Sequence, residues 1–195
     1  EASNMEINRR YYAALNKAAR TDTGQTEVYK IELLMKQAKI TTDDRKVTVA
    51  AKERAEQLGV PTAAVELPDG VIVTSKTTDF LGASAALLLN ALKHLAGISH
   101  ETRLIKPEAI EPIQELKVKY LGGKNPRLHT DEVLIALTLA ASSDANAKAA
   151  LEHLPMLKGC QVHTSVMLSE VDIKIFKKLG MELTSEPIQT SKKVY

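Results

Sequence analysis

The segment from Lys76 to Ser84 holds the residues best suited to binding an anion. It joins the end of an expected strand to the start of an expected helix, where free N–H groups and the helix dipole favour negative charge. Lys76 adds positive charge, and Thr77 and Ser84 add hydroxyl donors. The segment lacks the several glycines of a Walker loop. A capped helix start beside a solvated lysine has the same sequence, so both interpretations stay open.

Residues 125–132 form a second polar segment ahead of an apolar helix. Arg127 suits a carboxylate or phosphate through paired hydrogen bonds, and His129 can act as an acid or base near neutral pH. The alternative makes Thr130 a helix cap and Arg127 half of an interdomain salt bridge. The first interpretation completes a candidate ligand-binding set: Lys76, Thr77, Ser84, Asn125, Arg127 and His129.

The candidate catalytic residues are His129 and His163, and the sequence leaves open whether the chain is an enzyme. Cys160 and His163 are three residues apart, so on a strand they point to opposite faces and do not form a nucleophile–base pair. Cys160 is therefore expected to be a small buried residue. His163 shares a face with Ser165, but no third residue that would orient it can be identified.

No metal site and no cofactor are predicted. A single cysteine cannot form a thiolate cluster, and the five histidines show no ligand spacing. Zinc-dependent deamination needs a His or Cys beside a Glu and then a cysteine pair, which the chain lacks. The net charge of +2, the 4% of aromatic residues and the absence of Trp disfavour nucleic acid as a partner.

The sequence also indicates a cytoplasmic protein. Its most apolar stretch, Leu81 to Leu92, is too short to cross a bilayer, and its first residues have no apolar secretory core. A lone cysteine fits a reducing compartment. Because the sequence begins without Met and enters an amphipathic helix at once, it is expected to be a segment of a longer protein.

The periodicity of apolar residues predicts helices and strands in a mixed order. Three helices precede residue 60, and the third runs from a cap at Thr41 to Leu58, where Gly59 ends it. A helix is expected after Pro107, with Pro112 either kinking it or starting a second one. The remaining expected elements are strands at 62–67, 71–74, 161–168 and 181–185, and helices at 82–96, 131–141, 145–154 and 171–179.

These elements predict an α/β fold. Residues 1–60 form a helical segment and residues 61–195 an α/β subdomain. The terminal strand–helix–strand unit favours a parallel pair, whereas the turn at residues 68–70 favours an antiparallel hairpin. The expected architecture is three-layer α/β/α with a mixed sheet, preceded by the helical segment.

Four stretches, residues 66–70, 76–93, 111–114 and 125–137, resemble the C-terminal half of a bacterial family catalogued as domain of unknown function 1846. The resemblance covers almost the whole chain. It implies a cytosolic bacterial protein with an additional N-terminal half that carries a glycine-rich, phosphate-loop-like segment. It also implies a three-layer outline similar to that of cytidine deaminases. The family has no established activity, so the resemblance supplies no mechanism.

Two functional hypotheses follow. In the first, the chain helps its own N-terminal half to bind a phosphorylated or nucleotide-like small molecule. In the second, it is a non-catalytic packing or oligomerisation module, because the helices at 82–96 and 131–141 are apolar nearly all round. The two differ in geometry: Lys76 and Arg127 converge on one pocket in the first and lie apart in the second.

Overall fold

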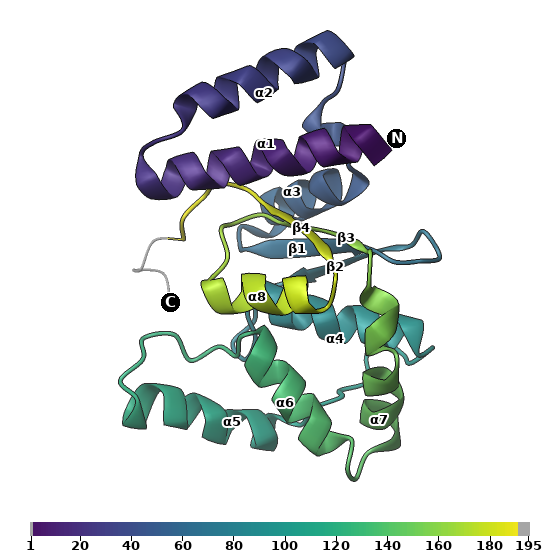
Figure 1. The fold of residues 1–195 in the computed structure, drawn as a ribbon. Helices are drawn as coiled ribbons and strands as arrows, with labels where there is room; N and C mark the ends of the chain where they lie inside the picture. Colours follow the sequence, from purple (N-terminus) through teal and green to yellow (C-terminus); the bar gives the residue numbers. More distant parts are fainter. Residues whose placement is uncertain (1, 191–195) are drawn as a thin grey trace.

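The computed structural model describes residues 2–190 (Figure 1). Its longer helices are α1 (Ala2–Thr21), α2 (Gln25–Ala38), α3 (Lys46–Leu58), α4 (Ala83–Leu95), α5 (Pro107–Glu115), α6 (Thr130–Ala140), α7 (Ala145–Glu152) and α8 (Glu170–Lys178). Three short helical turns are η1 (Thr42–Asp44), η2 (Leu116–Tyr120) and η3 (Leu154–Leu157). The strands are β1 (Thr62–Glu66), β2 (Ile72–Lys76), β3 (Gln161–Thr164) and β4 (Glu182–Ser185).

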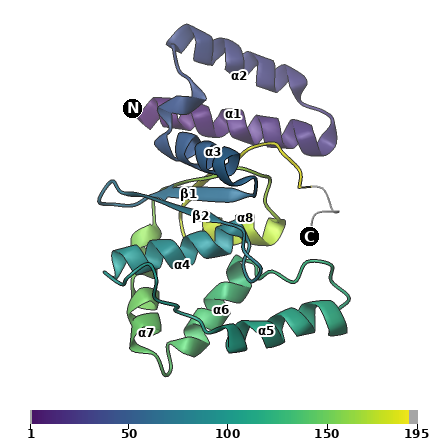
Figure 2. The ribbon, with the colours of Figure 1, turned by 180° about the vertical axis from the view of Figure 1, so that it is seen from behind.

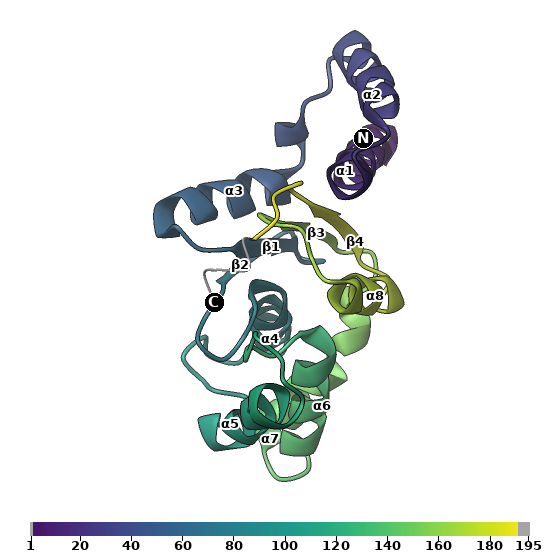
Figure 3. The ribbon, with the colours of Figure 1, turned by 90° about the vertical axis from the view of Figure 1, so that its left-hand side faces the viewer.

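The four strands form one mixed sheet in the order β2-β1-β3-β4. β1 runs antiparallel to both of its neighbours, and β3 and β4 are parallel. In Figure 3, α1 and α3 lie on one face of the sheet and α4 and α8 on the other, with α5, α6 and α7 beyond them. The predicted α/β fold with a mixed sheet is confirmed. The division into a helical segment and a subdomain at residue 60 stays a prediction.

The hairpin between β1 and β2 forms as expected. Its register pairs Thr62 with Lys76 and Glu66 with Ile72. Gly70 closes the turn with a φ of 80°, a left-handed conformation that glycine adopts without steric cost. The hairpin therefore places the end of β2 beside the first turn of α4, where the Ser75 hydroxyl donates to the Ala83 carbonyl at 2.7 Å.

Helix α4 fills the space between the sheet and the outer helices. Leu87, Leu88 and Leu92 are fully buried, and the helix contacts β1, β2, α6 and α7. Cys160 lies in the same core as a buried residue, as expected. The all-round apolar character of α4 is thus explained by packing within the chain. Among residues 2–190 no helix is long and apolar enough to cross a membrane.

The helix expected from Thr41 to Leu58 is divided at Arg45. This residue has an extended backbone, with φ −97° and ψ 102°, between η1 and α3. Its fully buried side chain donates to the Gln161 side chain, to the carbonyl oxygens of Val162 and Glu182, and to the Thr184 hydroxyl. Burial lowers the pKa of Arg45 to about 10, so the guanidinium stays charged at neutral pH.

Helix α1 has two buried faces rather than the one predicted. The apolar face, which includes Leu15 and Ala18, packs against α2. A polar face turns toward β4: the Tyr12 hydroxyl donates to Glu186 at 3.0 Å, and the Asn16 amide donates to the Ser185 carbonyl at 2.7 Å. The apolar pattern predicted an amphipathic helix and gave no sign of the polar contact with the sheet.

Other boundaries differ by a few residues. The strand expected at 161–168 ends at Thr164, and Thr130 is the first residue of α6 rather than its cap. Pro112 lies inside α5, which continues into the π-helical turn η2. Leu116 and Tyr120 are exposed.

Candidate functional site

A cavity of about 200 Å³ opens at the N-terminal end of α4, and we call it the α4 cavity. Five of the six predicted ligand-binding residues line it: Thr77, Ser84, Asn125, Arg127 and His129. Lys76 does not join them, because it lines a separate cavity of about 860 Å³. Neighbouring residues of an extended segment point to opposite sides, which separates Lys76 from Thr77. The expected convergence of Lys76 with Arg127 on one pocket is therefore not found.

Two loops distant in sequence form one wall of the α4 cavity. Leu81 and Leu128 make an isolated parallel β-bridge. The Gly82 amide donates to the Leu128 carbonyl at 3.2 Å, and the Leu128 amide donates to the Phe80 carbonyl at 2.9 Å. The two segments that the sequence suggested as separate candidates are thus joined by backbone hydrogen bonds.

The first turn of α4 supplies free donors at the α4 cavity. Gly82 occupies the cap position without a capping side chain, and the first amide bonded within the helix is that of Ala86, to the Gly82 carbonyl. The amides of residues 83–85 are those that a helix leaves without an internal acceptor. Ser84 is 3% exposed, and its hydroxyl has no hydrogen-bond partner among the described residues.

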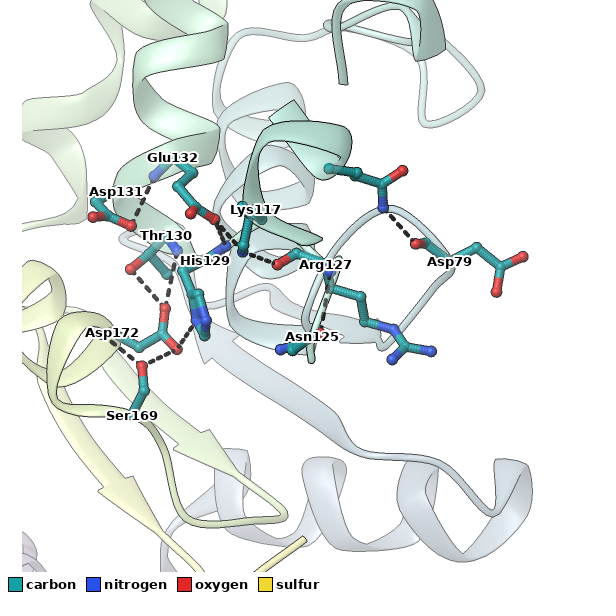
Figure 4. A network of polar contacts seen from close by, with 11 residues as sticks. Asp79, Lys117, Asn125, Arg127, His129, Thr130, Asp131, Glu132, Ser169 and Asp172 are labelled. Carbon is teal, nitrogen blue, oxygen red and sulfur yellow. Dashed lines mark hydrogen bonds and ion pairs between the residues drawn. The ribbon is translucent and has the colours of Figure 1, made fainter. Parts of the chain in front are cut away.

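Asp172, at the start of α8, lines the α4 cavity opposite α4 and is the centre of a polar network (Figure 4). It accepts hydrogen bonds from the Thr130 amide at 2.9 Å, the Thr130 hydroxyl at 2.8 Å and the Ser169 hydroxyl at 2.8 Å. His129 Nδ1 lies 3.1 Å from the same carboxylate. Each carboxylate oxygen therefore has two partners.

The contact between His129 and Asp172 favours the charged state of both groups. The hydrogen bond to Asp172 raises the pKa of His129, against the opposing effect of burial. Burial alone would raise the pKa of Asp172, but the hydrogen bonds from His129 and Thr130 outweigh it and lower that pKa. Since Nδ1 donates to the carboxylate, Nε2 is the ring nitrogen that gains and loses the proton.

A second set of contacts fixes the backbone around His129. Glu132 accepts from the His129 amide at 2.7 Å and pairs with Lys117 Nζ at 2.7 Å. The Arg127 amide donates to the Asn125 side chain at 3.1 Å, and Arg127 Nε donates to the Thr78 carbonyl. In Figure 4 the Arg127 side chain extends away from the His129 ring. His129 is therefore the cation closest to the Asp172 carboxylate, and Arg127 lies at the rim.

His163, the other candidate catalytic residue, is not brought to the α4 cavity. It is fully buried, and its ring contacts Tyr12 at 4.9 Å between centroids. Nδ1 lies 2.8 Å from the Thr184 hydroxyl and Nε2 lies 3.1 Å from Glu186. Burial lowers the pKa of His163. Both ring nitrogens are engaged under α1, which fits a structural role.

Among the residues that line the α4 cavity and that sequence reasoning missed are Thr164, Ser169 and Asp172. Ser169 and Asp172 carry the signature of a helix cap, and the Ser169 hydroxyl does accept from the Asp172 amide. This pattern involves only neighbouring residues. It therefore could not predict that the Asp172 carboxylate also accepts hydrogen bonds from Thr130 of α6. Among residues 2–190 no group of three or more His, Cys, Asp or Glu is placed to hold a metal ion.

Taken together, the free amides, the Ser84 hydroxyl and the oriented imidazole of His129 suit an anion. A histidine whose Nδ1 is fixed by a buried carboxylate is also a common arrangement for acid–base chemistry. The observed contacts define the orientation of His129 without defining a reaction.

Comparison with known proteins places the chain in a family. It is 51% identical over its whole length to UPF0371 protein cu0538 of Corynebacterium urealyticum and 47% identical to UPF0371 protein SUB1165 of Streptococcus uberis. It is 48% identical to UPF0371 protein DIP2346 of Corynebacterium diphtheriae. The chain spans only 39%, 40% and 39% of these relatives. The family model described as "Domain of unknown function DUF1846, C-terminal" matches residues 43–195, and the chain belongs to this family.

Proposed function

We propose that the α4 cavity binds the phosphoryl group of a small phosphorylated molecule. The observation that carries this proposal is the Ser84 hydroxyl, which is buried and unpartnered among the described residues, beside the free amides of residues 83–85. Burying a hydroxyl without a hydrogen bond costs about 1–3 kcal/mol. A phosphate oxygen would accept from the hydroxyl and from the amides at once.

The charges around the cavity support this assignment. Asp172 would repel an anion, but its four hydrogen bonds offset much of its charge. Protonated His129 neutralises the rest, and Lys117 is paired with Glu132. The helix dipole of α4 and the rim cation Arg127 then favour a negative ligand.

The volume of the α4 cavity limits the size of the ligand. About 200 Å³ is below the roughly 300–1,000 Å³ of typical small-molecule sites. A phosphoryl group with a small body, such as a sugar phosphate, fits better than a complete nucleotide. Because the chain spans 39% of its relative cu0538, the rest of a longer protein is proposed to complete the site around the ligand body.

Substitution of Ser84 by alanine tests this proposal. Inorganic phosphate and glucose 6-phosphate are titrated into the 195-residue chain while the backbone amides of residues 83–85 are followed by NMR. We expect those amides to shift, and we expect Ser84→Ala to weaken binding by about tenfold, since hydrogen bonds to charged groups are among the strongest. The same variant should be as stable as the wild type or more so, because no partner loses its hydrogen bond.

The control is Lys76→Ala, which removes a cation from the neighbouring cavity. It should change phosphate affinity by less than about twofold. Amides of residues 83–85 that do not respond to either compound, or equal losses in both variants, would refute the proposal.

The pH dependence of anion binding provides a second prediction. Because hydrogen bonding to Asp172 raises the pKa of His129, the imidazole is protonated below that pKa and neutral above it. Affinity for inorganic sulfate, whose own charge is constant near neutral pH, should fall as the pH rises through the pKa of His129. His129→Gln should flatten this profile. A wild-type sulfate affinity that stays constant between pH 5 and pH 9 would contradict the assignment of His129.

One observation favours a second candidate function, a packing module. Ile135 and Leu139 of α6 are 62% and 68% exposed. Tyr120, the last residue of η2, and the adjacent Leu121 are exposed as well. Large apolar side chains at such exposure often mark an interaction surface. The occupant we propose is the remaining part of a longer relative. Lack of affinity between the chain and that part, measured by sedimentation, would remove this candidate.

A further inference from the structure

We propose that the larger cavity, separate from the α4 cavity, is a second binding site that takes a nucleoside phosphate. We call it the β2–α5 cavity, because residues of strand β2, helix α4 and helix α5 line it. These three elements can be followed in Figure 2. Its volume of about 860 Å³ lies within the range of small-molecule and cofactor sites, roughly 300–1,000 Å³. The site does not depend on the phosphoryl site proposed for the α4 cavity.

Four cationic side chains from four parts of the chain line the β2–α5 cavity. They are Arg54 of α3, Lys76 of β2, Lys93 of α4 and Arg103 of the loop before α5. Among the described residues none of the four has an ion pair within 4 Å. Glu101 is the one acidic residue in the lining, beside His100. The balance of charge is strongly positive and favours an anion.

The ammonium group of Lys93 is held in place by a hydrogen bond and is not surrounded by water alone. Its ammonium group donates to the His100 carbonyl at 2.6 Å, which holds it against the loop after α4. Burial lowers its pKa, and Glu101 acts in the opposite direction. A partly desolvated ammonium group interacts more strongly with an anion than a fully hydrated one does.

The lining of the β2–α5 cavity also contains apolar residues. Leu89, Leu104, Ile105 and Ile110 are buried in the main core and expose a part of their surface to the cavity, and Phe80 lies beside them. The aromatic ring of Phe80 is only partly buried. Such a wall suits a flat apolar group, which an aromatic ring can contact face to face or edge to face.

The combination of cationic and apolar residues in the lining indicates the class of ligand. An inorganic or sugar phosphate would use the cations and leave the apolar wall in contact with water. An apolar metabolite would leave the cations without partners. A nucleoside phosphate uses both, with its base on the apolar wall and its phosphates at Lys76, Arg103 and Arg54. A polynucleotide is disfavoured because the chain carries a net charge of only +2.

The experiment is calorimetric titration of the 195-residue chain with mono- and triphosphates of the four common nucleosides. Tripolyphosphate and adenosine are titrated separately to test each half of the ligand. We expect saturable binding of at least one nucleotide, and weaker binding of tripolyphosphate and of adenosine by tenfold or more. Lys76→Ala and Arg103→Ala should each reduce nucleotide affinity severalfold, since both side chains are exposed and would contact phosphate at the cavity rim.

Two control variants separate this site from other effects. Lys148→Ala removes an exposed cation on α7, far from the lining, and should leave nucleotide affinity unchanged. Ser84→Ala should do the same, because Ser84 belongs to the α4 cavity. The inference is overturned if no nucleotide binds, if tripolyphosphate binds as tightly as the best nucleotide, or if Ser84→Ala abolishes nucleotide binding while Lys76→Ala does not.

Discussion

Replacing Arg45 with alanine should lower the free energy of unfolding by about 4 kcal/mol, which is at the upper end of the range for single substitutions. The guanidinium supplies all of its hydrogen bonds inside the protein, to β3 and β4. Its loss leaves the buried carbonyl oxygens of Val162 and Glu182 without this donor and creates a cavity beneath α3. Denaturant unfolding followed by circular dichroism measures the change.

Two further variants make this result interpretable. Arg45→Lys keeps the positive charge but cannot reach several acceptors at once, so its loss should be about half as large. Arg54→Ala, an exposed position on α3, should change stability by no more than about 0.5 kcal/mol. A loss at Arg45→Ala no greater than that at Arg54→Ala would show that the hydrogen bonds of Arg45 contribute little to stability.

Replacing Asp172 with alanine is expected to cost about 3 kcal/mol, close to the loss seen when one partner of a buried charged pair is removed. The carboxylate joins the first turns of α6 and α8, and its loss leaves the buried Thr130 amide and hydroxyl unpaired. It also removes the partner of His129. Chemical unfolding near neutral pH gives the stability change, and NMR titration of His129 should show its pKa falling.

Conservative and neighbouring changes provide the comparison. Asp172→Asn keeps an oxygen for Thr130 but removes the charge, so it should lose less stability while still lowering the pKa of His129. Glu170→Ala, in the same helical turn, breaks only an exposed ion pair with Arg20 and should cost less than about 1 kcal/mol. If the pKa of His129 is unchanged in Asp172→Asn, the pairing described here is wrong.

The lowered pKa of Asp172 also determines how the stability of the fold changes in acid. Because this pKa is lowered in the folded protein, the carboxylate stabilises the fold above the pKa that it has in the unfolded chain. That contribution to stability disappears as the pH falls through the pKa that Asp172 has in the folded protein. The difference in stability between the wild type and Asp172→Asn should therefore shrink in acid.

The sequence was sufficient to predict features that depend on local patterns. The β1–β2 hairpin follows from the turn at Gly70, the parallel pair of β3 and β4 from the helix between them, and the burial of α4 from its composition. The break at Arg45 could not be predicted in this way. It depends on hydrogen bonds to strands more than 100 residues away, and no local pattern records such partners.

The candidate site shows the same division. Polar residues around Ser84 and His129 were identified from two loop segments, and the structure brings those segments together through Leu81 and Leu128. The direction of each side chain could not be predicted from the sequence. Lys76 was therefore grouped with residues of the α4 cavity, although it lines the other cavity. Asp172 was not among the candidates, since its contact with His129 joins positions 43 residues apart.

The polar face of α1 has a consequence for how the chain is made. Tyr12 bonds to Glu186 across 174 positions, and Asn16 bonds to Ser185 across 169. On a ribosome that adds about 5–20 residues per second, these partners emerge roughly 10–30 seconds after the helix itself. During that interval Tyr12 and Asn16 lack these partners, and the side of α1 that faces the sheet is open to chaperones until residues 185 and 186 have been translated.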